Sequence, residues 1–281
     1  MKLSLMPESF VNQATARCSV DGSKYWFNCN PDGPYHWFKV NWIDKAEEKK
    51  LVYLHFMMDD NLSLSERIKA RYRSKYSGVF YKRYILGLWV AAEGIIYDMF
   101  DTAKHVIDKT TVSIGQKYVS VDYGTQNATV FLLWEKNQKG QWVCKKEYYY
   151  SGRDEDSQKT DGEYANDMEK FTDGLEIERI IIDPSAASFI AELKKRGFRI
   201  KKANNDVLDG IRFVGNMLNL GMILFHESCQ ETIKEFASYI WDDKALERGE
   251  DKPVKQHDHC MDAVRYFAYT IIRRERKWRV K

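Results

Sequence analysis

Long apolar runs are missing from the sequence. No stretch approaches the roughly 18 consecutive apolar residues of a transmembrane helix, so we expect a soluble chain with no membrane partner. The five cysteines are an odd number and include no C-x-x-C pair, which argues against both a disulfide framework and a structural zinc site. This cysteine usage indicates a reducing cytoplasm.

Three widespread catalytic signatures are also missing. The chain has no G-x-x-x-x-G-K-[ST] phosphate loop, no G-x-S-x-G and no H-E-x-x-H. Aromatic residues are plentiful, with 8 Trp, 17 Tyr and 14 Phe among 281 residues. They supply ample material for a packed core, and the length suits one large domain or two smaller ones.

The first hundred residues show mixed, irregular patterning. Residues 24–28 and 51–56 alternate as strands do, and Ser63-x-x-Glu66 is a capping box that predicts a helix to about residue 76. A short helix is expected over 79–86. The stretch 101–115 has few periodic apolar positions and is a candidate linker.

The pattern changes after this stretch. Three strands at 118–123, 128–135 and 141–150, separated by turn residues, predict an antiparallel meander. Helices and strands then alternate, and the run of three isoleucines at 180–182 is typical of a strand covered on both faces. The order of these elements predicts an α/β domain with a sheet of mixed direction.

Two acids follow apolar strands. Asp122 ends one strand directly before Tyr123 and Gly124, and Asp183 follows the isoleucine run directly before a helix. Each also has a structural interpretation, because Asp122 would serve as a turn acid and Asp183 as a helix N-cap.

The segment 258–266 holds a third group of polar residues. On a helix, His259 and Asp262 share a face, and Asp258 and Asp262 lie one turn apart, where two like charges favour a nearby cation. The structural alternative is that Asp258 caps the helix and His259 is a surface histidine.

Carboxylates from separate elements that meet in one pocket repel one another unless a hard divalent cation binds them. Two such ions activate water and stabilise the leaving oxygen in phosphodiester cleavage. A DNA-binding surface is also needed, and basic residues cluster at two places that are otherwise interpreted as solvated helix faces. The members are Lys194, Lys195, Arg196, Arg199, Lys201 and Lys202 in the first cluster, and Arg273 and Arg274 within the basic C-terminal segment. The residues alone therefore predict a metal-dependent nuclease.

Several segments together resemble the large terminase subunit of tailed bacteriophages. In the C-terminal part these are VSVDYG at 119–124, IIDPSA at 181–186 and DHCMDAVRY at 258–266. Further upstream, KYWFNCNP at 24–31, PYHW at 34–37 and GVFYKR at 78–83 are similar to the end of the family's ATPase domain. The segments 87–90 and 93–97 resemble the junction between its two domains.

This resemblance implies a fold and a domain division. We expect an α/β fold with a ribonuclease H-like mixed sheet flanked by helices, preceded by an incomplete remnant of a P-loop ATPase domain. Residues 1–105 would be the C-terminal portion of the motor domain with its linker, and residues 106–281 the nuclease domain.

The resemblance also implies roles for residues. Asp122, Asp183 and Asp262 would be ligands of two Mg²⁺ or Mn²⁺ ions, His259 a ligand or proton-transfer partner, and Asp258 an additional group at the site. All but Asp258 would be catalytic. In the first part of the chain, Asn28 and Asn30 would fall where the family couples ATP hydrolysis to DNA movement.

One departure from the family concerns ATP. The phosphate loop and the Asp-Glu pair for Mg²⁺–ATP would precede Met1, so we expect a fragment or one half of a split gene product, with no ATPase activity alone. ATP would act only in the full-length motor. Expected partners are double-stranded viral DNA, the small terminase subunit, the portal protein and the missing ATPase half, in the host cytoplasm at the procapsid.

Two other functions are compatible with these residues. A ribonuclease H-like resolvase or transposase would use the same acids, although the motor-like first part argues against it. A non-catalytic module that docks DNA or the portal would use the acids only as caps and turn residues. Dependence on metal separates the nuclease from the docking module.

Overall fold

The structure is a computed structural model that describes residues 6–108, 113–124, 127–152 and 157–278. The chain divides into two compact units. The first unit comprises Met1–Ile96 with Ile240–Pro253, and the second comprises Tyr97–Tyr239 with Val254–Lys281. The functional division at residues 105 and 106 remains a prediction.

The second unit is built on a seven-stranded sheet with the order β1-β7-β4-β3-β2-β5-β6. Its strands are β1 (Val106–Ile107), β2 (Ser113–Asp122), β3 (Ala128–Asn137), β4 (Trp142–Ser151), β5 (Ile177–Ile182), β6 (Ile200–Lys202) and β7 (Ile223–His226). Strands β2, β3 and β4 form an antiparallel meander, and the other neighbours pair in parallel. The predicted α/β fold with a mixed sheet flanked by helices is confirmed.

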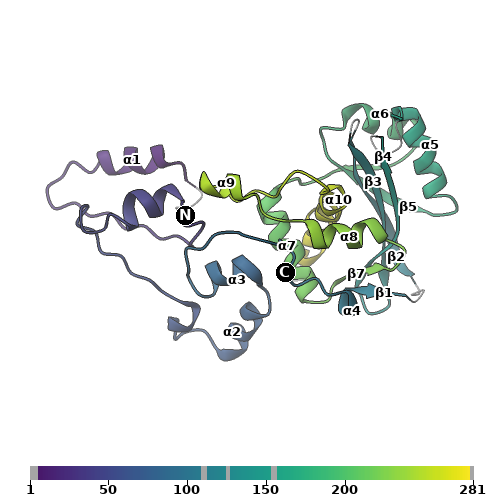
Figure 1. Cartoon of the computed structure of the whole chain (residues 1–281). Helices are drawn as coiled ribbons and strands as arrows, with labels where there is room; N and C mark the ends of the chain where they lie inside the picture. The colour runs from purple at the N-terminus through teal and green to yellow at the C-terminus, as the bar shows by residue number, and fades with distance from the viewer. Residues whose placement is uncertain (1–5, 109–112, 125–126, 153–156, 279–281) are drawn as a thin grey trace. The chain divides into compact units, whose positions relative to one another are not determined.

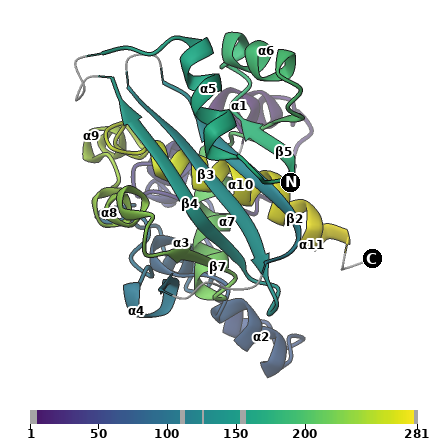
Figure 2. The same cartoon turned by 90° about the vertical axis from the view of Figure 1, so that its right-hand side faces the viewer.

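Helices cover both faces of this sheet. They are α4 (Thr102–His105), α5 (Asp161–Phe171), α6 (Ala187–Lys195), α7 (Val207–Asn219), α8 (Gln230–Ser238), α10 (His259–Phe267) and α11 (Arg273–Trp278), with a π-helical turn at Ala268–Ile272. Figures 1 and 2 show α5 and α6 on one face and α7, α8 and α10 on the other. Because both faces are covered, β5 carries a continuous isoleucine run instead of alternating polar residues.

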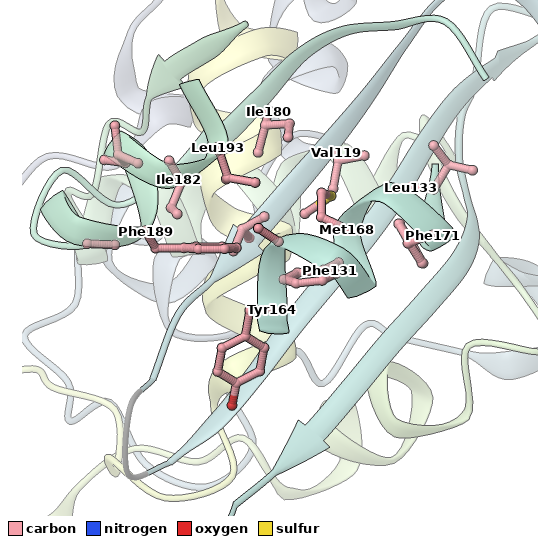
Figure 3. Close-up of a cluster of buried hydrophobic side chains, with 14 residues drawn as sticks. Val119, Phe131, Leu133, Tyr164, Met168, Phe171, Ile180, Ile182, Phe189 and Leu193 are labelled. Atoms are coloured by element: carbon pink, nitrogen blue, oxygen red, sulfur yellow. The ribbon is translucent and has the colours of Figure 1, made fainter. Parts of the chain in front are cut away.

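The main core lies between the sheet and the helices α5 and α6 (Figure 3). Val119 and Val121 of β2 point into it, while Ser120 between them points to the opposite face, as the pleat of a strand requires. On that opposite face the buried Ser120 hydroxyl accepts a hydrogen bond of 2.8 Å from the Trp134 indole. This packing fixes the register of β2 and therefore where its final residue, Asp122, is placed.

The first unit contains short helices joined by irregular segments. They are α1 (Glu8–Ala16), α2 (Glu66–Arg73), α3 (Gly78–Tyr84) and α9 (Asp243–Glu247), with a π-helical turn at Lys39–Ile43 and a 3-10 turn at Met58–Asp60. The predicted helix after residue 63 exists, but its N-cap is Ser65, whose hydroxyl accepts from the backbone of Ile68.

Two strand predictions in this unit are wrong. Residues 24–28 and 51–56 are in no strand, and within the described part of this unit the ladder contacts are isolated bridges, Ile95 with Ile240 and Trp241 with Pro253. Alternating side chains make a segment suitable for a sheet, but a strand forms only where a neighbour accepts its hydrogen bonds.

The linker predicted at 101–115 is also partly wrong. Helix α4 and strand β1 lie within it, and β1 pairs with β7 at the edge of the sheet. Residues 109–112 of that segment are outside the described residues. Among the helices described, none is both long and apolar enough to span a membrane.

Candidate active site

Asp122 is the last residue of the central strand β2. Its side chain is only 15% exposed, and its Oδ2 lies 2.8 Å from Nδ1 of His259, the first residue of α10. Burial raises the pKa of Asp122, the hydrogen bond from His259 lowers it, and the nearby charges of Asp262 and Asp258 raise it, with a net upward shift. A buried acid with other acids nearby favours a positive charge at this position.

His259 responds in the complementary way. Burial acts to lower its pKa, but the hydrogen bond and the charge of Asp122, together with the charge of Asp258, raise the pKa above its usual value. The imidazole is therefore held against Asp122 and favours the protonated form. His259 faces the carboxylates instead of acting as an isolated surface histidine.

Asp183 follows β5 at the same end of the sheet. The strands β2 and β5 are parallel neighbours, and their last paired residues are Val121 and Ile182, so Asp122 and Asp183 leave adjacent strands together. The Asp183 oxygens accept hydrogen bonds from the backbone of Ser185 at 2.8 Å and from the side chain of Asn205 at 3.0 Å.

The structural interpretation of Asp183 as a helix N-cap does not hold. Helix α6 begins at Ala187 with Ala186 at its N-cap position. Burial raises the pKa of Asp183, but hydrogen bonds from Ser185, Asn205 and Tyr266 outweigh it and lower the pKa overall. Asp183 is therefore an ionised carboxylate next to Tyr266.

Asp258 occupies the N-cap position of α10 without capping it, since its side chain accepts no hydrogen bond from the helix. Glu235 of α8 caps the helix instead, and its Oε2 accepts from the backbone N–H groups of Cys260 at 2.8 Å and Met261 at 3.1 Å. The carboxylate of Asp258 is thereby free to face Lys255, which donates to it at 2.9 Å.

Asp262 is held between two cations. Its Oδ1 accepts from Arg265 at 2.7 Å and its Oδ2 from Lys255 at 3.1 Å. Arg265 is 2% exposed and also donates to the backbone carbonyls of Asn205 and Asp206. Although Arg265 belongs to the basic C-terminal segment of the sequence, it is a buried partner of the site.

Tyr266 links the three acids predicted as ligands. Burial raises its pKa, and the charges of Asp122, Asp262 and Asp183 raise it further. One tyrosine on α10 is thus coupled to carboxylates from β2, from the end of β5 and from α10 itself. The structure brings together the five residues predicted for the site, and their chemical roles remain predictions.

The donor set suits a hard divalent cation in its chemistry. It consists of carboxylate oxygens, which Mg²⁺ and Mn²⁺ prefer, and the ammonium of Lys255 stands where a cation would sit between Asp258 and Asp262. Among the described residues, however, no group of three or more His, Cys, Asp or Glu side chains is arranged to hold a metal ion. Each carboxylate is instead engaged by a protein donor.

The other predicted residues lie elsewhere. Asn28 and Asn30 are in an irregular segment of the first unit, Asn28 exposed and Asn30 partly buried. Of the basic residues, Lys194, Lys195, Arg199, Lys202 and Arg274 are exposed, Lys201 is partly buried, and Arg273 stacks on the ring of Tyr269 at 4.2 Å.

Arg196 differs from the other basic residues because its guanidinium is bound within the protein. It donates to the side chains of Glu192, Asn166 and Glu169 and to the backbone carbonyl of Gly162. These bonds join α6 to α5, so its predicted contact with DNA would require breaking them.

Sequence reasoning missed four groups around the acids. Tyr266 and Arg265 follow Asp262 by four and three positions on one helix, so helical spacing offered a signal for these two residues. Lys255 lies in the bend before this helix, so only its closeness in sequence to Asp258 pointed to it. Glu235 offered no signal, because only the packing of α8 against α10 brings it to the helix start.

The chain is similar to known phage proteins. The large terminase from a thermophilic bacteriophage is 60% identical with a TM-score of 0.90, and the match covers 96% of this chain and 69% of that one. The structure of the same phage protein in complex with ADP matches with the same identity and TM-score.

Two further matches are more distant. The large terminase subunit of Escherichia phage T5 is 26% identical over 195 residues, which is 64% of this chain and 43% of the T5 protein. This chain thus spans less than half the length of that relative. The nuclease domain of the P22 large terminase has a TM-score of 0.51 at 14% identity, and the match covers 64% of this chain and 93% of the P22 domain. This match supports the fold alone. No protein-family profile matches the chain.

Proposed function

The chain belongs to the large terminase family of bacteriophages, and we propose that its second unit is an endonuclease that cuts concatemeric double-stranded viral DNA by metal-dependent hydrolysis. The observation that carries this proposal is the convergence of Asp122, Asp183 and Asp262. Asp122 and Asp183 follow adjacent parallel strands, and Asp122 lies 2.8 Å from His259 on the helix that carries Asp262. Asn205 donates to Asp183, and its carbonyl accepts from the arginine that holds Asp262. Acids that served only as caps and turn residues would not need to meet.

Each acid has a proposed role at the cleavage site. Two Mg²⁺ or Mn²⁺ ions, when bound, supply an activated water and neutralise the charge on the leaving oxygen. Asp122, Asp183 and Asp262 would hold them, and Asp258 lies close enough to Asp262 to share Lys255 and would assist. Parallel pairing of β2 with β5 fixes two of these acids relative to each other before any ligand arrives.

His259 is the proposed proton-transfer partner. Its Nδ1 is oriented by Asp122, and the raised pKa favours the protonated ring. A proton on His259 would be delivered to the departing 3′ oxygen. Tyr266, whose raised pKa keeps its hydroxyl protonated, donates to Asp183 and keeps that carboxylate in place.

The proposed DNA contacts, partners and location follow from membership of the family. Exposed lysines such as Lys194 and Lys202 would hold DNA phosphates. The small terminase subunit and the portal protein are the proposed partners, with the host cytoplasm at the procapsid as the location. ATP would act only in a longer motor that contains the remainder of the ATPase domain, to which Asn28 and Asn30 would be coupled.

The test is cleavage of supercoiled plasmid in EDTA, Mg²⁺ or Mn²⁺, with Asp183→Asn and Asp262→Asn beside the unchanged protein. We expect nicking and linearisation that need metal and fall by about 100-fold or more in both variants. Asp173→Asn, which changes an exposed acid just after α5, is the matched control and should cleave normally.

Equal cleavage by the unchanged protein and Asp183→Asn, or cleavage that persists in EDTA, would refute the proposed site. No cleavage under any condition by a folded protein would favour the docking module. The resolvase alternative has lost its support, because the match to a terminase extends over 96% of the chain.

A further inference from the structure

Lys255 makes an unusual pair of contacts beside the acids. It lies three residues before the N-cap of α10, and its Nζ is 2.9 Å from Oδ2 of Asp258 and 3.1 Å from Oδ2 of Asp262. Both carboxylates are buried, with side-chain exposures of 7% and 9%, whereas the Lys255 side chain is 61% exposed. One lysine with a largely exposed side chain therefore pairs with two buried acids.

The two cations on Asp262 differ in how firmly they are held. Arg265 is buried and is fixed by backbone carbonyls from the segment before α7, so it has no access to solvent. The two acids are the partners found for Lys255 among the described residues, and its long side chain reaches them from the surface. Arg265 is a permanent part of the site, and Lys255 is displaceable.

A divalent cation at this cluster would need the oxygens that Lys255 occupies. Carboxylate oxygens bound to an ammonium have no lone pair directed to a metal at the same position, and the positive charge of Lys255 repels an incoming cation. The same charge relieves repulsion between Asp258 and Asp262 while no metal is present. Stabilising the metal-free state in this way must weaken metal binding by an equal free energy.

We propose that Lys255 is a built-in competitor for the divalent cation, which must displace its ammonium from Asp258 and Asp262 in order to bind. This inference rests on the proposed function, because it concerns the metal of the same site. It makes Lys255 a residue that sets the metal affinity of the enzyme, distinct from the acids that hold the ions. It also accounts for carboxylates that converge without forming a ready coordination shell among the residues described.

The test measures Mn²⁺ binding directly, by the electron paramagnetic resonance signal of free Mn²⁺ at pH 8. Replacing Lys255 with Met keeps the chain length and removes the charge, and we expect the dissociation constant to fall about tenfold. The Tm in EDTA should fall, because Asp258 and Asp262 then repel each other, and the Tm rise on adding Mn²⁺ should be larger than in the unchanged protein.

Two variants serve as controls. Lys255→Arg keeps the positive charge and should bind Mn²⁺ close to the unchanged protein. Lys252→Met removes a lysine of nearly the same exposure, 60%, that pairs with Glu250 on the surface, and should change neither the affinity nor the Mn²⁺-induced shift in Tm.

The outcomes separate this inference from the proposed function. Binding by Lys255→Met that is unchanged or weaker than in the unchanged protein would overturn the competitor role, even if plasmid cleavage confirms the nuclease. Absence of Mn²⁺ binding by every variant, including the unchanged protein, would instead overturn the metal-dependent site, and this inference with it.

Discussion

Gly210 of α7 leaves the space that Arg265 of α10 occupies. A Cβ atom at Gly210 would lie 2.6 Å from Cγ and 2.7 Å from Cδ of Arg265, well inside van der Waals contact. The arginine is buried in this position and holds Asp262 at 2.7 Å. A glycine on a different helix from the acid therefore controls the placement of Asp262.

Replacing Gly210 with Ala should disturb the candidate active site through Arg265, although the added methyl group contacts none of the acids. Arg265 must move in a packed interior, so we expect a loss of about 1–3 kcal/mol in the free energy of unfolding and weaker cleavage. Urea denaturation and the plasmid assay measure the two effects.

Gly215→Ala on the same helix is the matched control for this prediction. Its Cβ would meet only the flexible end of Met99, at 3.4 Å from Cε. Alanine favours helix over glycine by about 1 kcal/mol, so this variant should be as stable as the unchanged protein or more so. Equal losses in the two variants would show that contact with Arg265 is not the cause.

Glu235 makes stability depend on pH. Burial raises its pKa from 4.5 to about 7, although hydrogen bonds from Met261 and Cys260 lower it. Between these two pH values the folded state retains the proton on Glu235 and the unfolded state releases it. The contribution of this group to the free energy of unfolding is therefore fully present below pH 4.5 and is lost as the pH rises to about 7. The loss from this group is roughly 3 kcal/mol.

Glu235→Gln isolates this effect, because glutamine does not titrate and its carbonyl can accept the same backbone N–H groups. Urea denaturation from pH 4.5 to pH 8 should show the difference in stability between Glu235→Gln and the unchanged protein growing in favour of the variant up to about pH 7. Parallel pH curves for the two proteins would mean that the carboxyl of Glu235 titrates normally.

Arg83 joins two stretches of the first unit, the one before residue 97 and the returning segment Ile240–Pro253. Its guanidinium is 3% exposed and pairs with Asp32 at 2.9 Å and with Asp251, and it also donates to the carbonyl of Val90. Replacing Arg83 with Met would leave the buried Asp251 and the partly exposed Asp32 without their cation, so we expect a loss of about 3–5 kcal/mol in the free energy of unfolding.

The control for Arg83 is Lys39→Met in the same unit. This change breaks a more exposed pair with Asp44 and should cost about 1 kcal/mol or less. Thermal unfolding compares the two, and a loss for Arg83→Met no larger than that for Lys39→Met would show that the buried pair is not needed for stability.

The basic residues in and after α6 should divide into those that bind DNA and one, Arg196, that stabilises the fold. Lys194→Ala with Lys202→Ala removes exposed charges, and we expect weaker DNA binding and a plot of log K against log salt that is shallower by roughly one unit per lost phosphate contact. Arg196→Ala should lower the Tm through its lost bonds to α5 and leave this slope unchanged. Fluorescence anisotropy at several salt concentrations measures DNA binding by each variant. A reduced slope for Arg196→Ala would contradict the assignment of Arg196 as a structural residue that does not contact DNA.

The regular elements of the second unit followed from local pattern. The meander of β2, β3 and β4 and the helices after it were predicted because strand and helix periods differ and turn residues separate them. The failures lie in the first unit, where 24–28 and 51–56 carry a strand pattern without a partner strand in the described part of the chain. Pairing is a property of two segments, so the pattern of one segment cannot decide it.

The sequence by itself determined which residues are chemically suitable: acids at the ends of apolar strands, and an acid and a histidine on one helix face. Tertiary structure decided what surrounds them. Glu235 caps α10 in place of Asp258. The missing side chain of Gly210 leaves the space in which Arg265 reaches Asp262. Lys255 lies close to its acids in sequence, yet only the folded chain shows that it holds both. The physical reason is that a residue's type is local, whereas its burial, charge environment and hydrogen-bond partners depend on chain segments that folding brings together.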